Sequence, residues 1–105
     1  MTERDALIAR DLKRRLGSAV PLVELRVYGS RARGDSNEWS DLDVFVEVER
    51  TSAEIRERIA DAAWELSLEH LVHVSPLVFT RHELEETPQR SSPVVRNIMR
   101  EGVSV

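Results

Sequence analysis

Residues 28–43 decide the fold, and they read Tyr-Gly-Ser-Arg-Ala-Arg-Gly-Asp-Ser-Asn-Glu-Trp-Ser-Asp-Leu-Asp. An apolar run, 22–28, leads into this stretch, and a second apolar run, 41–48, leads out of it. Alternation of apolar and polar residues in both runs predicts two strands. The Gly, Ser, Asp and Asn residues between them predict a turn-rich connection. This connection is too long for a tight hairpin. It leaves room for a short helix and permits either a parallel or an antiparallel pair.

The second strand sorts its side chains onto two faces because successive residues of a strand point in opposite directions. One face is predicted to carry four apolar residues: Leu42, Val44, Val46 and Val48. The other face is predicted to carry Asp41, Asp43, Phe45 and Glu47. We therefore expect the first face to lie in the core and two carboxylates to lie together on the second.

Apolar residues at helical spacing predict a helix on each side of the strand pair. The first runs from Thr2, as its N-cap, to Leu16. The second runs to about His70, and Thr51 and Glu54 are predicted to begin it as a capping box.

The rest of the chain predicts one more main strand and two short helices. The third strand is expected over residues 71–79, where Pro76 indicates an edge strand or a bulge. The segment Thr80-Arg-His-Glu83 is a capping box for a short acidic helix. Ser92-Pro93 begins a last helix, and residues 103–105 allow a short last strand. This order predicts a single α/β (α+β) domain over residues 1–105, a small mixed sheet with helices packed mainly on one face.

Composition excludes several classes of function. Fifteen Lys and Arg residues against 19 Asp and Glu give the 105-residue chain a net charge of −4, which argues against a broad nucleic-acid surface. The chain has no cysteine, so it has no thiolate metal site and no cysteine nucleophile. No apolar run approaches the roughly 20 residues that span a membrane, and no signal peptide is evident. A cytoplasmic protein is expected, and its oligomeric state stays open, a homo-oligomer included.

The Asp-x-Asp pair is the first candidate site. Asp41 and Asp43 leave the same face of a strand, with Cα atoms roughly 6.5–7 Å apart. Two such carboxylates suit Mg²⁺ or Mn²⁺ when a phosphate supplies further ligands, and the cation removes their mutual repulsion. A pair of solvated carboxylates at the start of a strand is the alternative.

The residues between the two strands offer groups for a phosphate. Gly29 allows close approach of a ligand to the backbone, and Ser30 adds an N–H group and a hydroxyl. Arg31 and Arg33 can form fork-like hydrogen bonds with phosphate oxygens. The alternatives are a simple turn at Gly29-Ser30 and arginines that pair with Asp35 or Glu38.

Trp39 has two interpretations as well. It can stack on a nucleotide base, or it can pack over its own loop. His70 and His82 are expected at the surface.

The motif resembles the signature of DNA polymerase beta-like nucleotidyltransferases. It consists of Gly29-Ser30, ten further residues and then Asp41-Leu42-Asp43. The chain is most similar to the minimal nucleotidyltransferases (MNT), since Ala32-Arg33-Gly34 and Ser40 also fit. The resemblance implies the nucleotidyltransferase fold. It further implies that Asp41 and Asp43 bind Mg²⁺ or Mn²⁺, that they form the catalytic set together with Ser30, and that ATP is a substrate.

The resemblance also implies a third carboxylate on the next strand, where this chain has His73. Three interpretations of His73 stay open. It can be a structural strand residue, a general base for the attacking hydroxyl, or a contact to a metal ion other than Mg²⁺.

The resemblance implies an enzyme that transfers a nucleoside monophosphate, AMP from ATP, to an acceptor hydroxyl. Stand-alone MNT proteins commonly pair with small helical HEPN proteins as antitoxin and toxin, so the implied acceptor is a hydroxyl of such a partner. Two alternatives stay open. One is a binding module that neutralises a HEPN partner by contact, and the other is a nucleotide sensor without transfer.

Overall fold

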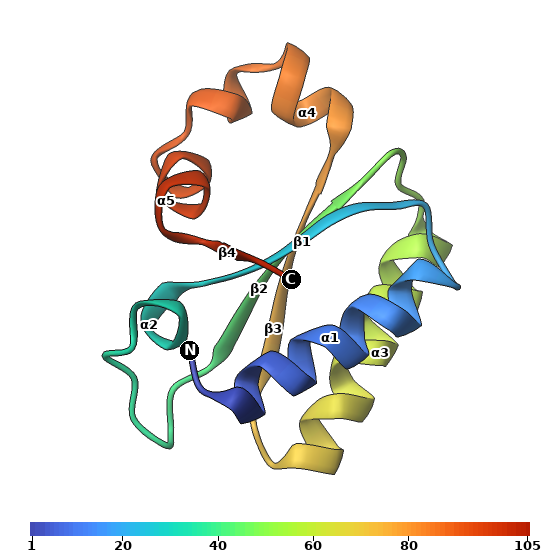
Figure 1. Ribbon diagram of the computed structural model, residues 1–105. Helices are drawn as coiled ribbons and strands as arrows, with labels where there is room; N and C mark the ends of the chain where they lie inside the picture. The colour runs from blue at the N-terminus through green and yellow to red at the C-terminus, as the bar shows by residue number, and fades with distance from the viewer.

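The computed structural model describes all residues, Met1–Val105. Its elements follow the order α1 (Glu3–Gly17), β1 (Leu22–Tyr28), α2 (Gly29–Arg33), β2 (Leu42–Val48), α3 (Ala53–His70), β3 (Val74–Thr80), α4 (Arg81–Glu86), the 3-10 helix η1 (Pro88–Ser91), α5 (Pro93–Glu101) and β4 (Val103–Ser104). Both predicted strands around the motif are present, and the connection between them contains the short helix α2 (Figure 1).

A mixed four-stranded sheet in the order β3-β2-β1-β4 forms the centre of the molecule. β1 and β2 are antiparallel, which settles the alternative that the sequence leaves open, and their register places Tyr28 opposite Asp43. β3 lies parallel to β2, with Ser75 beside Asp43. Because β3 is an edge strand, the prediction from Pro76 is confirmed.

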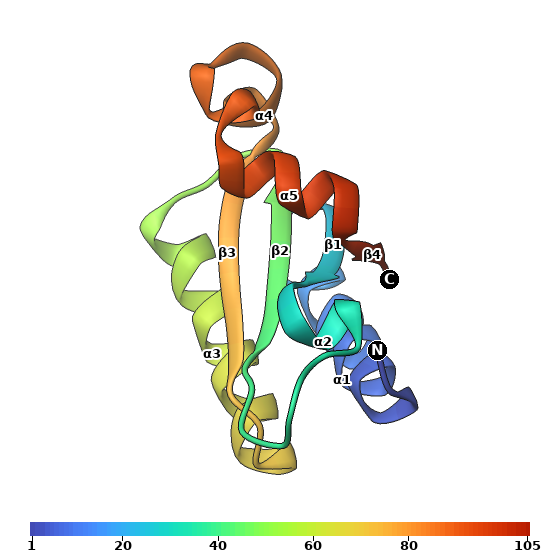
Figure 2. The ribbon, with the colours of Figure 1, turned by 90° about the vertical axis from the view of Figure 1, so that its left-hand side faces the viewer.

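The sheet separates two apolar clusters, as the alternation in β2 predicts. The two long helices, α1 and α3, cover one face (Figures 1 and 2), and the main core of 16 buried residues lies between them and the sheet. On the opposite face Phe45 packs with Phe79 and with Val95 and Ile98 of α5. The two phenylalanine rings are 5.9 Å apart. Helices thus lie mainly on one face, and α5 covers part of the other.

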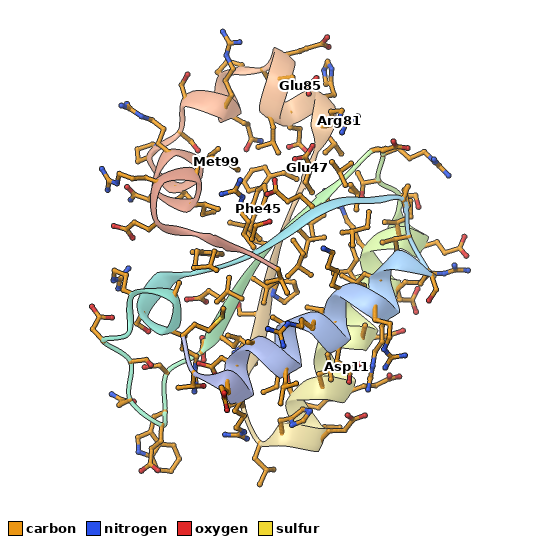
Figure 3. All side chains as sticks on the ribbon, viewed as in Figure 1. Asp11, Phe45, Glu47, Arg81, Glu85 and Met99 are labelled. Atoms are coloured by element: carbon orange, nitrogen blue, oxygen red, sulfur yellow. The ribbon has the colours of Figure 1, made fainter.

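Polar residues follow Phe45 along the second face. Phe45 points toward α5, and the next residue on the same face, Glu47, points toward Arg81 at the start of α4 (Figure 3). Glu47 Oε2 lies 3.6 Å from Arg81 Nε. Burial raises the pKa of Glu47, and Arg81 acts in the opposite direction.

The helix caps confirm most of the predicted boundaries. Thr2 caps α1, Ser92 caps α5, and Thr80 with Glu83 forms a complete capping box at α4. The predicted box at α3 is wrong, because Ser52 is the N-cap and its hydroxyl accepts the Ile55 N–H. The helix therefore starts one residue later than the box of Thr51 and Glu54 requires.

The third strand begins at Val74, later than predicted. Leu71 ends α3 in the left-handed conformation, with φ 53°, so the residues before Val74 form the turn between helix and strand. The predicted start at residue 71 is wrong because apolar character does not distinguish a C-cap from a strand.

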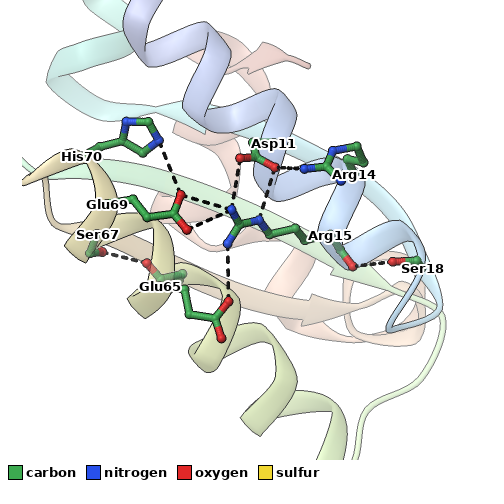
Figure 4. A network of polar contacts seen from close by, with 9 residues as sticks. Asp11, Arg14, Arg15, Ser18, Glu65, Ser67, Glu69 and His70 are labelled. Carbon is green, nitrogen blue, oxygen red and sulfur yellow. Dashed lines mark hydrogen bonds and ion pairs between the residues drawn. The ribbon is translucent and has the colours of Figure 1, made fainter.

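Helices α1 and α3 are also tied together by charged side chains (Figure 4). Arg15 of α1 lies 3.1 Å from Glu69 and 3.4 Å from Glu65 of α3, and it also contacts Asp11 of its own helix. The two helices thus form one layer. None of the helices combines the length and apolar character that a membrane crossing requires.

Most of the N–H positions on the exposed edge of β3 are not free to donate to another strand. Leu42 N donates to the His73 carbonyl, so ladder alternation directs residues 74, 76, 78 and 80 away from β2. Val74 N donates to Ser67 Oγ at 2.9 Å, Pro76 has no N–H, and Thr80 N donates to Glu83 Oε1 at 3.1 Å. Only Val78 keeps a free outward N–H, so sheet extension at this edge is disfavoured.

Ser67→Ala should therefore destabilise the fold. The hydroxyl of Ser67 is buried and bridges the Ala63 carbonyl and the Val74 N–H. Its removal leaves a buried donor unsatisfied, for which we expect a loss of about 1–3 kcal/mol in the free energy of unfolding. Urea denaturation measures the loss. Ser18→Ala, which removes an exposed hydroxyl bonded to the Arg15 carbonyl, is the control and should change stability little.

Candidate active site

The turn from β1 into α2 brings backbone directly against a carboxylate. Gly29 has φ +76°, a conformation that favours glycine. A Cβ atom at this position would lie 2.6 Å from Asp43 Oδ2. Because Tyr28 pairs with Asp43 across the β1–β2 ladder, the sheet register itself creates this contact. A side chain at position 29 would therefore displace the Asp43 carboxylate.

The two aspartates differ in their environment. Asp41, just before β2, has a side chain that is 51% exposed, while Asp43 is partly buried within the strand. Burial raises the pKa of Asp43, and the charge of Asp41 raises it further, while His73 and Arg33 lower it. The repulsion between these carboxylates is the condition that a bound cation would relieve.

His73 lies beside Asp41, at the turn before β3. Its Nδ1 atom is 3.2 Å from Asp41 Oδ1, and its side chain is 62% exposed. Asp43 has Ser75 as its neighbour on β3. His73 therefore lies next to Asp41, and the β3 residue beside Asp43 is a serine and not a carboxylate.

Arg31 has a different role from the predicted one. Its side chain is only 7% exposed, and Nη1 lies 2.9 Å from Asp5 Oδ1 of α1. Nε and Nη2 donate to the carbonyl of Ser40, the residue before Asp41, at 2.9 and 2.7 Å. All of these contacts lie within the protein, so Arg31 fixes the loop that carries Asp41 and is not free to bind a nucleotide. Its pairing with Asp5 also differs from both alternatives, Asp35 and Glu38.

Arg33 and Ser30 remain accessible. Arg33 Nε lies 3.2 Å from Asp35 Oδ2, and Nη1 lies 3.4 Å from Glu101 Oε2 of α5. Its side chain is 45% exposed. The hydroxyl of partly exposed Ser30 makes no hydrogen bond to another residue. Trp39 is 83% exposed, so the expectation that it packs over its loop is wrong, because no element lies against this part of the chain.

A pocket of about 210 Å³ adjoins the motif. It lies between α2, the end of β1 and α5, and its lining consists of Tyr28, Gly29, Arg33, Val94, Asn97, Ile98 and Glu101. Apolar side chains and a few polar groups share the lining, which is typical of a site for a small organic ligand. The residues from α5 lie more than 60 positions after Gly29. No local pattern indicates them, and only their apolar helical face could have suggested that α5 packs on the sheet.

The donor set fits a divalent cation that shares its ligands with a phosphate. No group of three or more His, Asp or Glu side chains converges in the chain, so protein atoms alone do not form a closed cage. Mg²⁺ is commonly held by one or two carboxylates together with substrate phosphates and water. Asp41 and Asp43 supply carboxylates of this kind, and Arg33 is near enough to influence the charge of Asp43.

Comparison with known proteins agrees with this geometry. The model of the nucleotidyltransferase domain family matches residues 8–105, so the chain belongs to this family and the resemblance to the DNA polymerase beta-like superfamily is confirmed. A crystal structure described as a "putative nucleotidyltransferase" from Sulfolobus solfataricus is similar in fold, with a TM-score of 0.58 and 21% identity. The similarity covers 96% of this chain and 78% of that chain. A search of curated proteins gives no match.

Two glycines of the motif provide a matched test of the Gly29–Asp43 contact. Gly29 and Gly34 both have positive φ, but a Cβ atom at Gly34 would meet nothing within 4 Å. Gly34→Ala should cost about 1–2 kcal/mol of unfolding free energy from backbone strain alone. Gly29→Ala should cost more because it also displaces the Asp43 carboxylate.

Urea denaturation in a double-mutant cycle separates these two costs. In an Asp43→Ala background, Gly29→Ala should cost no more than Gly34→Ala, since the clashing carboxylate is absent. An equal cost of Gly29→Ala in both backgrounds would contradict the contact.

The two arginines of the motif should differ sharply in their effect on stability. Arg31→Ala leaves Asp5 buried without its partner, for which we expect a loss of about 3–5 kcal/mol. Arg33→Ala should leave the free energy of unfolding nearly unchanged, since its ion pairs are exposed to solvent. Chemical denaturation of both variants measures the difference. Similar losses for the two would show that Arg31 does not hold the loop as described.

Proposed function

We propose that this protein transfers a nucleoside monophosphate, AMP from ATP, to a hydroxyl group of a protein partner. One observation carries the proposal, namely the Asp43 carboxylate at the start of β2 against the Gly29 backbone, with the Asp41 carboxylate two residues earlier. Membership of the nucleotidyltransferase domain family supports it. Donor, acceptor and metal are parts of the proposal.

We assign the nucleoside half of the donor to the pocket between α2 and α5. Its volume of about 210 Å³ is below the roughly 300–1,000 Å³ typical of whole small-molecule sites. The triphosphate then lies outside the pocket, toward the aspartates. Ser30 and Arg33 flank this path, and Arg33 would exchange its contacts with Asp35 and Glu101 for phosphate oxygens.

The transfer forms one bond and breaks another. The acceptor hydroxyl oxygen bonds to the α-phosphorus, the bond from the α-phosphorus to the bridging oxygen breaks, and pyrophosphate leaves. Asp41 and Asp43 would hold the divalent cation, Mg²⁺ or Mn²⁺, which supplies positive charge to the phosphate oxygens when bound. The contribution of the protein is mainly position and charge.

His73 is our candidate for the group that accepts the hydroxyl proton. Its Nδ1 faces Asp41 at 3.2 Å, so an Nδ1–H tautomer leaves Nε2 as the acceptor. A carboxylate that orients an imidazole in this way is a common arrangement for a general base.

The partner in this proposal is a small helical HEPN protein, and the chain acts as the antitoxin of a toxin–antitoxin pair. The accessible surface near the aspartates supports an acceptor that comes from outside. Asp41 is half exposed, and Trp39, two residues earlier, is 83% exposed.

A second candidate is an MNT-fold module that neutralises a HEPN partner by contact without transfer. The specific observation in its favour is the lack of a third carboxylate. His73, just before β3, lies beside Asp41, and Ser75 of β3 lies beside Asp43.

Transfer of label from α-labelled ATP to the partner protein tests the enzyme proposal. With Mg²⁺ or Mn²⁺ present, Asp41→Ala or Asp43→Ala should lower labelling by about 100-fold, the scale seen when a preorganised electrostatic group is lost. Glu38→Gln is the matched control, since it removes an exposed carboxylate of the same loop that makes no ion pair, and it should label normally.

The outcomes separate the two candidates. No labelling by the unaltered protein with its HEPN partner would reject the enzyme proposal. If the aspartate variants still bind that partner and suppress its activity while the unaltered protein does not label it, the contact module is favoured.

A further inference from the structure

The helical face of the molecule exposes apolar side chains that its own fold does not cover. Leu7 of α1 is 63% exposed, and on α3 Trp64 is 61% and Leu68 is 58% exposed. Leu71, at the end of α3, is 88% exposed. Several exposed apolar side chains on neighbouring helices indicate an interaction surface more than a single one does.

On α3 the apolar residues belong to one row with two acidic ones. Glu57, Asp61, Trp64 and Leu68 are separated by four, three and four positions, the spacing by which a helix contacts another helix, and Leu71, the C-cap, follows the end of the row. All five are exposed. The first half of the row is acidic and the second half is apolar.

On α1 a second row has the complementary order. Glu3, Leu7, Arg10 and Arg14 are separated by four, three and four positions, and all are exposed. After Glu3, which lies at the rim, this row is apolar first and basic afterwards.

The charged residues of both rows are available for an intermolecular contact. Arg10, Glu57 and Asp61 make no ion pair within the chain. Arg14 is 75% exposed and contacts only Asp11, one turn away on its own helix. Two basic residues on α1 and two acidic residues on α3 are each four positions apart. Contact with solvent alone does not require this match.

We propose that this face binds a second copy of the chain, with α1 of each copy laid antiparallel along α3 of the other. In this arrangement Leu7 lies opposite Trp64 in the apolar half of the α3 row, and Leu68 and Leu71 lie beyond it, at the end of the contact where Glu3 lies opposite Leu68. Arg10 and Arg14 meet the acidic half, formed by Glu57 and Asp61.

The geometry of one subunit allows both contacts to form at once. α1 and α3 lie side by side in opposite directions. Arg4 near the start of α1 bonds to the His70 carbonyl at the end of α3, and Arg58 near the start of α3 bonds to the Ala19 carbonyl just after α1. A two-fold axis that runs parallel to the two helices, above the face and midway between them, places α1 of the second copy over α3 of the first. Each α1 then lies antiparallel to the α3 of the other copy.

The two helices that carry the rows are already fixed relative to each other within one subunit. The Arg15 network that ties α1 to α3 (Figure 4) keeps the two rows in a fixed relation, so little order has to be gained on association.

The dimer leaves the candidate active site free. Asp43 and Phe45 point to the face of the sheet opposite α1 and α3. The proposal therefore does not depend on the proposed function, and either can fail without the other.

Sedimentation velocity over a range of concentrations tests the proposal with the full chain. We expect a monomer–dimer equilibrium that weakens as salt concentration rises, since part of the contact is ionic. Trp64→Glu should raise the dimer dissociation constant by about 100-fold or more, because it places a charge opposite Leu7 in the apolar part of the contact. Trp39→Glu is the control for an exposed aromatic residue outside the surface and should not change it.

Charge reversal makes the test specific for this pairing. A variant with Arg10→Glu and Arg14→Glu should stay monomeric, and so should a variant with Glu57→Arg and Asp61→Arg, since like charges then meet in both contacts. Mixed together, the two variants restore opposite charges in both contacts and should form a heterodimer.

Three results would overturn the proposal. These are a monomer at every concentration, a dimer that Trp64→Glu leaves unchanged, and two charge-reversed variants that fail to associate when mixed. Because all substituted positions are exposed, circular dichroism should show that each variant keeps the fold. If the protein is a stable monomer, this face would instead bind a different protein.

Discussion

The register of β1 on β2 is the constraint on which the rest of the structure depends. It sets Tyr28 opposite Asp43 and therefore places the next residue, Gly29, directly against the Asp43 carboxylate. A shift by one residue would turn the apolar face of β2 to solvent and the carboxylates into the core. The burial of Leu42 and its apolar partners thus holds the site in place, so core packing and site geometry are one requirement.

The two arginines of the motif have different roles, one in the structure and one at the candidate site. Arg31 is buried and binds Asp5 and the Ser40 carbonyl, so it joins α1, α2 and the residue before Asp41. Arg33, two positions later, lies at the surface beside the pocket. The two arginines of this short helix therefore have different roles. Residues two positions apart in a helix point in different directions, so one arginine points inward and the other outward.

The sheet divides the molecule into two faces with different character. One face is covered by α1 and α3, whose outer surface carries complementary apolar and charged rows. The other carries the aspartates, Phe45 and α5 around an open pocket. The free edge at β3 is blunted by Ser67, Pro76 and Glu83, so association through helices is favoured over sheet extension. A small chain can thus keep a site open on one side and use the opposite side for contacts.

By itself the sequence determined the strands 22–28 and 41–48, the second of which starts at Leu42 in the structure, the long helices and the candidate residues Gly29, Asp41 and Asp43, because short-range periodicity and turn chemistry control them. It misplaced the cap of α3 and the start of β3, where neighbouring residues compete for the same role. Only the tertiary structure decided that Arg31 is buried, that His73 lies on Asp41, and that α5 completes a pocket beside Gly29. These features join segments far apart in the chain, and no local pattern encodes a contact whose free energy arises only when the sheet and helices pack together.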